Sequence, residues 1–127
     1  MNYLLDTHVL LWAMFEPHKL SRTARELLTG DDSLKFISIV TMWELAIKNR
    51  IGKLALPIGI HQIFLRVEQM NVGLVGVDQQ DIEMFNTLPL LHRDPFDGIL
   101  ISSAIAGNMT IITADENIHK YDVHWIW

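Results

Sequence analysis

The sequence contains no cysteine, and this absence removes several chemistries at once. The chain has no disulfide framework, no thiolate zinc site and no cysteine nucleophile, and its composition is compatible with a reducing compartment. Runs of proline, glycine or serine that would mark a linker are also missing, as are internal repeats. The chain of 127 residues therefore predicts a single domain, residues 1–127, that is long enough to bury a substantial core.

Positive charge is scarce as well. Ten Lys and Arg residues stand against fifteen Asp and Glu residues, which gives a formal net charge of −5. This balance argues against binding of nucleic acid by bulk electrostatics alone, although it leaves room for a local basic rim. The apolar segment 1–15 has no basic flank and is interrupted by Asp6 and His8, so it predicts neither a signal peptide nor a membrane span. We expect a soluble, cytoplasmic protein.

Five short apolar runs predict β-strands, and the segments between them predict helices. The strands are expected at 2–5, 35–39, 72–77, 110–113 and 123–127. Helical patterns follow the first four strands, and further ones occupy 20–30, 38–52, 60–70, 78–88, 94–107 and 115–121. Strands that alternate with helices imply right-handed crossovers, so the sequence predicts an α/β fold with a central, parallel, five-stranded sheet and helices on both faces.

Two acidic residues follow predicted strands that should be neighbours. Asp6 comes directly after the first strand, and Asp115 follows the fourth strand behind Thr113. In open α/β sheets, ligands bind beyond the carboxyl ends of the strands at the point where the strand order reverses. If the chain starts at the centre of the sheet, the first and fourth strands flank that point, and Asp6 and Asp115 face one crevice. The third strand would then lie at an edge, so we interpret Asp78 as a helix cap.

The segment "HRDPFDGILISSA", residues 92–104, places two further acids at the start of an apolar helix. Asp94 followed by Pro95 predicts an N-cap, and Asp97 in the first turn is also explained by the helix dipole without any function. However, this helix is apolar nearly all round and leads into the fourth strand, which brings Asp97 to the same crevice. For Asp94 the cap is the plainer interpretation, with a role near a metal as the alternative.

Glu44 is the remaining acidic candidate, within the predicted helix 38–52. Its plain alternative is an ion pair with Lys48 one turn on, on a solvated helix face. The apolar stripe beside Glu44 includes Trp43, which we expect in the core.

Convergence of Asp6, Glu44, Asp97 and Asp115 would have an electrostatic cost. At about 5 Å and an effective dielectric near 20, each carboxylate pair repels by roughly 3 kcal/mol, and six pairs sum to about 20 kcal/mol. Domains are stable by only about 5–15 kcal/mol. Such a cluster needs protonation or bound cations, and oxygen ligands select Mg²⁺ or Mn²⁺. Carboxylate-held Mg²⁺ suits phosphodiester hydrolysis, with one or two ions activating water and stabilising the leaving oxygen.

Four blocks carry a resemblance to a known family: "LLDTHVLLW", "SIVTMWELAIKNRIGKL", "HRDPFDGILISSA" and "IITAD". In this order and at this spacing, the sequence resembles PIN-domain ribonucleases, specifically the VapC-type toxins of bacterial toxin-antitoxin pairs, over essentially the whole chain. The resemblance implies a PIN-like three-layer fold and a metal-dependent endoribonuclease. It departs at Gly98, where a larger, often basic residue is common.

The resemblance also implies roles for individual residues. Asp6 and Asp97 would be the principal metal ligands, with Glu44 and Asp115 completing or water-bridging the shell of an acidic quartet. Substrate-binding or orienting positions would include Thr7, Thr113, Asp94, Arg93 and Lys48, and a rim for RNA would include Trp12, Arg50 and Lys53. The six histidines have no compact ligand spacing, and we assign none of them to a metal.

Family members generally cut single-stranded regions of structured RNA, form homodimers and are paired with a cognate antitoxin protein. Two other functions compete with this one. A phosphoacceptor receiver domain would need adjacent acids near the end of the first strand and an Asp ending the central strand, and the sequence has neither. An inactive binding module of the same fold is the other alternative, against which the presence of all four acids argues.

Overall fold

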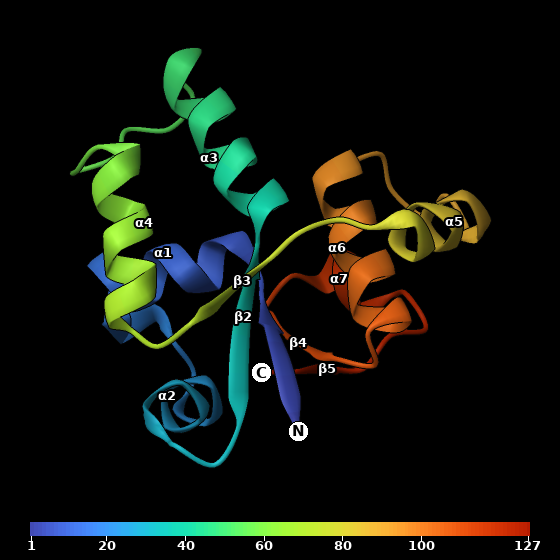
Figure 1. Cartoon of the computed structure of the whole chain (residues 1–127), viewed down its shortest axis with the longest axis horizontal. Coiled ribbons are helices and arrows are strands. Elements are labelled where there is room, and N and C mark those ends of the chain that lie inside the picture. The colour runs from blue at the N-terminus through green and yellow to red at the C-terminus, as the bar shows by residue number, and fades with distance from the viewer.

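Five parallel strands form one sheet through the middle of the molecule, in the order β3-β2-β1-β4-β5 (Figure 1). This computed structural model describes residues 1–127. The strands are β1 (Asn2–Leu5), β2 (Leu34–Ser38), β3 (Gly73–Val75), β4 (Thr110–Ile112) and β5 (Trp125–Ile126). Each lies within or beside a predicted apolar run, and the predicted parallel α/β sheet is confirmed.

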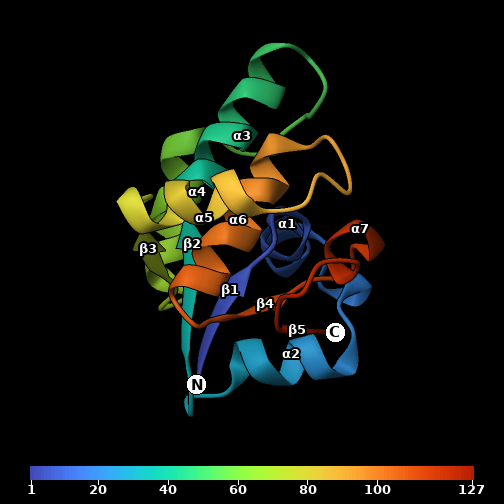
Figure 2. The same cartoon turned by 90° about the vertical axis from the view of Figure 1, so that its right-hand side faces the viewer.

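Seven α-helices surround the sheet: α1 (Thr7–Phe15), α2 (Arg22–Thr29), α3 (Ile39–Arg50), α4 (Ile60–Gln69), α5 (Gln79–Thr87), α6 (Pro95–Ala106) and α7 (Glu116–His119). A 3₁₀ turn, η1 (Pro17–Lys19), joins α1 to α2. Figures 1 and 2 show α1, α2 and α4 on one face of the sheet, α5, α6 and α7 on the other, and α3 rising from the end of β2. None of these helices combines the length and apolar character needed to cross a membrane.

Side-chain caps start several of the helices, and among these caps are Asp78 and Asp94, which the sequence predicts. The Ser21 hydroxyl accepts a hydrogen bond from the Ala24 N–H at the start of α2. Asp78 caps α5, where the Asp81 carboxylate accepts in return from the Asp78 N–H. Asp94 caps α6 with Pro95 in the first turn. These caps satisfy N–H groups that have no partner inside the helix, and they fix where each helix begins.

The hydrophobic core divides into two clusters, one on each face of the sheet. Because successive strand residues point to opposite faces, Leu4 packs with α6 and α7, whereas Leu5 packs with the helices of the other face. Ile111 and Ile112 in β4 alternate in the same way. All four side chains are fully buried, so both faces hold the central strands in place.

Strand β1 lies at the centre, paired with β2 on one side and β4 on the other, while β3 lies at an edge. The predicted strand order is therefore confirmed. The reversal of strand order falls between β1 and β4, and the residues that follow these two strands lie together.

The prediction that Trp43 belongs to the core is wrong. Its side chain is 62% exposed and meets the Phe96 ring edge-on, with ring centroids 5.7 Å apart. The buried face of α3 instead carries Thr41, Met42, Glu44 and Leu45. The helix is turned so that two polar residues face inward, which the apolar spacing alone does not reveal.

Gly98 departs from the family pattern for a packing reason. A Cβ atom at this position would lie 2.6 Å from Cε2 of Phe85, because α5 and α6 approach closely there. No side chain fits at residue 98 unless the Phe85 ring moves. The glycine therefore permits the contact between α5 and α6 next to Asp97.

This contact predicts coupling between two substitutions. Alanine in a helix is normally about 1 kcal/mol more favourable than glycine, but overpacking costs roughly 1–3 kcal/mol. Gly98→Ala changes the free energy of unfolding in both backgrounds. We expect this change to be less favourable in the wild-type chain than in a Phe85→Ala background, by at least about 1 kcal/mol. Urea unfolding of the four proteins in the double-mutant cycle measures this difference, and additive effects would contradict the clash.

Candidate active site

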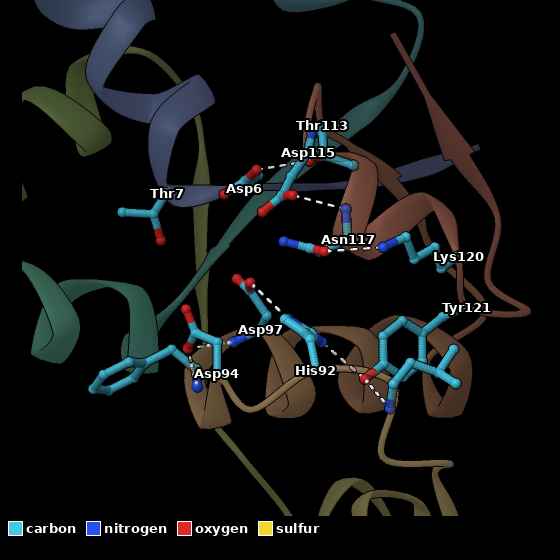
Figure 3. A network of polar contacts seen from close by, with 12 residues as sticks. Asp6, Thr7, His92, Asp94, Asp97, Thr113, Asp115, Asn117, Lys120 and Tyr121 are labelled. Atoms are coloured by element: carbon cyan, nitrogen blue, oxygen red, sulfur yellow. Dashed lines mark hydrogen bonds and ion pairs between the residues drawn. The ribbon is translucent and has the colours of Figure 1, made fainter.

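Asp6 is held at the centre of the site by groups from its own helix and from β4. Its Oδ2 accepts a hydrogen bond of 2.6 Å from the Thr113 hydroxyl (Figure 3), and its Oδ1 accepts one of 3.3 Å from the His8 N–H. The residue is 4% exposed. Burial raises the pKa of Asp6, the Thr113 hydrogen bond and His8 oppose the rise, and the charge of Asp115 adds to it.

Asp115 reaches the same place from the other central strand. Its backbone N–H donates to the Thr113 hydroxyl, 3.0 Å away, and its Oδ1 accepts from the Asn117 N–H at the start of α7. Asp6 and Asp115 both line a hollow of about 240 Å³, together with His8 and Trp12. The expected meeting of Asp6 and Asp115 across one crevice agrees with this geometry.

Asp97 enters from the first turn of α6, with its carboxylate directed toward Asp6 and Asp115 (Figure 3). Burial raises the pKa of Asp97 to about 6, and the charges of Asp94, Asp6 and Asp115 contribute to the rise, while the hydrogen bond from His92 opposes it. Oδ1 of Asp94 accepts hydrogen bonds from the N–H groups of Phe96 and Asp97 and thereby caps α6. Asp94, Asp6 and Asp115 therefore lie close enough for their charges to affect the ionisation of Asp97.

His92 is a residue of this site that the sequence analysis missed. Its Nε2 lies 3.0 Å from Oδ2 of Asp97, and its Nδ1 lies 2.9 Å from the Tyr121 hydroxyl (Figure 3). The Tyr121 oxygen accepts a hydrogen bond from the Leu91 N–H. This chain of contacts fixes the orientation of the Asp97 carboxylate. The position of His92 five residues before Asp97 was a local sequence signal for their contact. The second partner of His92, Tyr121, lies 29 residues away in the sequence and gave no such signal.

Glu44 is buried and already has two partners. Its Oε1 accepts a 2.8 Å hydrogen bond from the Thr7 hydroxyl, and its Oε2 pairs with Lys48 Nζ at 2.5 Å. The predicted Glu44–Lys48 pair is present, but Glu44 is 4% exposed, so the pair does not lie on a solvated face. The hydrogen bond to Glu44 raises the pKa of Lys48, and the charges of Asp94 and Asp97 add to the rise, which places the pair beside the acidic cluster.

The remaining rim candidates lie at different distances from the acids. Trp12 lines the hollow with Asp6, and Arg93 is exposed on the segment before α6, where it forms no ion pair. Arg50 and Lys53 are exposed at and beyond the end of α3. The structure thus places Trp12 and Arg93 close to the site and the other two farther along the α3 arm.

The donor atoms fit a hard divalent cation. Asp6, Asp97 and Asp115 present carboxylate oxygens whose charges repel one another, and a cation would relieve that repulsion. As they stand, no three His, Asp or Glu side chains are placed to share one ion, so these carboxylates would have to draw closer around it. Asp6 and Asp97 are the first candidates because their pKa values are raised by burial.

Comparison with known proteins agrees with this fold. The family model described as "PIN domain" matches residues 3–123. The chain is similar to the structure of VapBC2 from Rickettsia felis bound to a promoter DNA fragment, with 19% identity and a TM-score of 0.74 over 99% of this chain and 98% of that one. It is also similar to the structure of VapBC-1 from nontypeable Haemophilus influenzae, with 22% identity and a TM-score of 0.72 over 99% of this chain and 97% of that one.

A third structure, VapBC-5 from Mycobacterium tuberculosis, a member of the VapBC family of toxin-antitoxin systems, is 19% identical with a TM-score of 0.63 over 98% of this chain and 97% of that one. At these identities the likeness shows the fold. Among curated proteins, no relative matches the chain in sequence.

The raised pKa of Asp97 predicts that the site lowers stability at neutral pH. The folded chain binds the Asp97 proton more tightly than the unfolded chain does, so the stability from this residue is full below pH 3.8 and is lost as the pH rises through about 6. At about 1.36 kcal/mol per pH unit, the loss is at most about 3 kcal/mol at pH 7.5.

We therefore expect Asp97→Asn to be more stable than the wild type by about 1–3 kcal/mol at pH 7.5 in EDTA, and the gap to close near pH 4. Urea unfolding at both pH values measures this, with Asp32→Asn, at an exposed acid, as the control. A wild type more stable than Asp97→Asn at pH 7.5 would be the contrary result.

Proposed function

The chain belongs to the PIN domain family, and from that membership and its buried carboxylates we propose that it is a metal-dependent endoribonuclease, the VapC-type toxin of a toxin-antitoxin pair. The observation that carries this proposal is the gathering of Asp6, Asp97 and Asp115 at one end of the sheet, where the charges of Asp6 and Asp115 add to the raised pKa of Asp97. The fold likeness to VapBC structures supports the toxin assignment. A receiver domain has no corresponding support.

Asp6, Asp97 and Asp115 are the proposed ligands of Mg²⁺ or Mn²⁺, with Glu44 completing the acidic quartet directly or through water. A divalent cation in such a site activates water for phosphodiester hydrolysis and neutralises charge that develops on the phosphate. Thr113 holds Asp6, and His92 holds Asp97, so two ligands are oriented before a cation binds. Thr7 does the same for Glu44.

RNA is the proposed substrate, as a single-stranded region of a structured RNA. Lys48 pairs with Glu44 and Arg93 directly precedes Asp94, and these two cations are the proposed contacts for the phosphates on either side of the cut. Thr7, Thr113 and Asp94, which hydrogen-bond to Glu44, to Asp6 and to the Asp97 N–H, are the proposed residues that orient the site toward the substrate. Because the chain carries net charge −5, these local cations have to provide the attraction for RNA. We expect the chain to act as one domain in the cytoplasm.

Two apolar surfaces suit the proposed partners. An open groove of about 370 Å³ crosses α3, α5 and α6 and is lined by Trp43, Ile82 and Phe96, among others. A second copy of the chain is the proposed partner that covers this groove. A hollow of about 220 Å³ between α1 and the segment 54–57 is lined by Trp12 and Phe15, among others. The antitoxin is the proposed partner that binds in this hollow. Monomers seldom expose apolar patches of this kind without a partner.

The central test is cleavage of RNA by the purified chain. We expect cleavage with Mg²⁺ or Mn²⁺ and none in EDTA, because the carboxylates need a cation to bring in phosphate and water. Asp6→Asn and Asp97→Asn should each reduce the rate by more than about 100-fold, since even changes behind metal ligands cost roughly 10- to 100-fold. Gel analysis of a labelled RNA and mapping of new 5′ ends measure this.

Asp32→Asn, at an exposed acid away from the cluster, is the matched control and should cleave like the wild type. Full activity of Asp6→Asn would refute the proposal. Tight RNA binding without cleavage under any metal would instead support the inactive binding module.

A second prediction concerns the affinity for Mn²⁺, which should change in opposite directions when Glu44 and Lys48 are substituted. Glu44→Gln should weaken Mn²⁺ binding by roughly 10- to 100-fold if Glu44 completes the metal shell. Lys48→Met should tighten Mn²⁺ binding by about fivefold, because it frees Glu44 from an ion pair worth up to about 1 kcal/mol. Isothermal titration calorimetry measures both affinities.

Lys53→Met, at an exposed lysine without an ion pair, serves as the control. If Lys48→Met weakens Mn²⁺ binding, or Glu44→Gln leaves it unchanged, Glu44 holds Lys48 in place and does not belong to the metal shell.

A further inference from the structure

A separate cavity of about 530 Å³ lies beside the acidic site, and the proposed hydrolysis does not use it. Its walls come from Phe85 in α5, the segment 88–94, the first turns of α6 and Tyr121. The volume falls within the range of about 300–1,000 Å³ typical of pockets that bind small organic groups. It is large enough to admit one such group from a bound substrate.

The cavity and the acidic site share two residues. His92 lines the cavity and contacts Asp97 at 3.0 Å, and Asp94 lines it while capping the helix that carries Asp97 (Figure 3). A group bound in the cavity would therefore lie one residue away from the proposed metal ligands.

The walls offer three kinds of contact. Phe85 and Leu91 are partly exposed apolar side chains, 39% and 48% accessible. The backbone N–H groups of Leu90, His92 and Arg93 donate to no acceptor within the chain. Arg93 is exposed and forms no ion pair. An apolar wall, free hydrogen-bond donors and a guanidinium match, in that order, the face of a base, its polar edge and the adjacent phosphate.

We propose that this cavity binds the nucleobase next to the cleaved phosphodiester bond and sets the base preference of the enzyme. The proposal rests on the proposed ribonuclease function. A nucleotide fits better than an apolar side chain of a protein partner, because a nucleotide carries an anion beside its flat base and Arg93 stands at the cavity without a counter-ion. The cut phosphate would then face Asp97 while its neighbouring base lies behind His92.

Nucleotide binding without cleavage tests the cavity directly. The four nucleoside 5′-monophosphates are added to the full-length protein in EDTA, and amide shifts are followed by NMR. We expect shifts in residues 88–93 and at Gly98, larger for one base than for the others, and none in α2. Arg93→Gln should weaken binding of a short RNA by fivefold or more, whereas Arg22→Gln, at an exposed arginine of α2 that pairs with Glu26, should not.

Base preference provides a second test, because a change in charge alone would alter the affinity for RNA without altering which base is preferred. Leu91→Trp adds bulk at the cavity wall and should flatten the preference at the position beside the cut, mapped on an RNA with randomised sequence. Leu65→Trp, at a comparably exposed leucine on α4, should leave the preference unchanged. A preference that survives Leu91→Trp, or nucleotides that shift no amide in 88–93, would overturn the inference.

The outcomes separate this inference from the function on which it rests. Metal-dependent cleavage with no base preference beside the cut would overturn the base subsite and leave the ribonuclease in place. Shifts in 88–93 caused by nucleotides, with no cleavage under any metal, would remove the ribonuclease and keep the nucleotide cavity. Shifts caused by a peptide of a partner protein and by no nucleotide would assign the cavity to protein recognition and overturn the inference.

Discussion

The candidate site depends on one constraint, the parallel pairing of β1 with β4 at the centre of the sheet. This pairing brings the Thr113 hydroxyl to 2.6 Å from Asp6, although the two residues are 107 positions apart. Because all five strands are parallel, Asp6 and Thr113, which follow β1 and β4, lie at the same edge of the sheet as Ser38, the last residue of β2. Fully buried residues on both faces of β1 and β4 fix that register, so the acids cannot separate without loss of the core.

Residues that end or begin regular elements were predictable from the sequence. Asp6, Asp94 and Asp115 are the N-caps of α1, α6 and α7, and a cap is a local signal that needs only its next few residues. The strand order followed from connection rules once the apolar runs were placed. Most of the fold, and the meeting of Asp6 with Asp115, therefore lay within reach of sequence reasoning.

The parts that were missed depend on long-range contacts. The face of α3 was assigned from apolar spacing, yet Glu44 is buried, where Thr7 on α1 donates to it, and Trp43 is turned outward. The role of His92 depends equally on Tyr121 far along the chain. Polar residues that face a site invert the usual inside-outside pattern of a helix, so periodicity fails at the positions where chemistry is concentrated.

The charges of the site fall into two halves with different energetics. Glu44 has Lys48 and Thr7 as partners inside the chain, so its buried charge is compensated. Neither Asp6 nor Asp97 forms an ion pair with a lysine or arginine, and burial raises the pKa values of both residues. An anionic substrate would aggravate that imbalance, whereas a divalent cation between carboxylates and phosphate would satisfy both. The same imbalance that lowers stability at neutral pH thus supplies the affinity for a cation, and a fully compensated cluster would be more stable and unable to bind one.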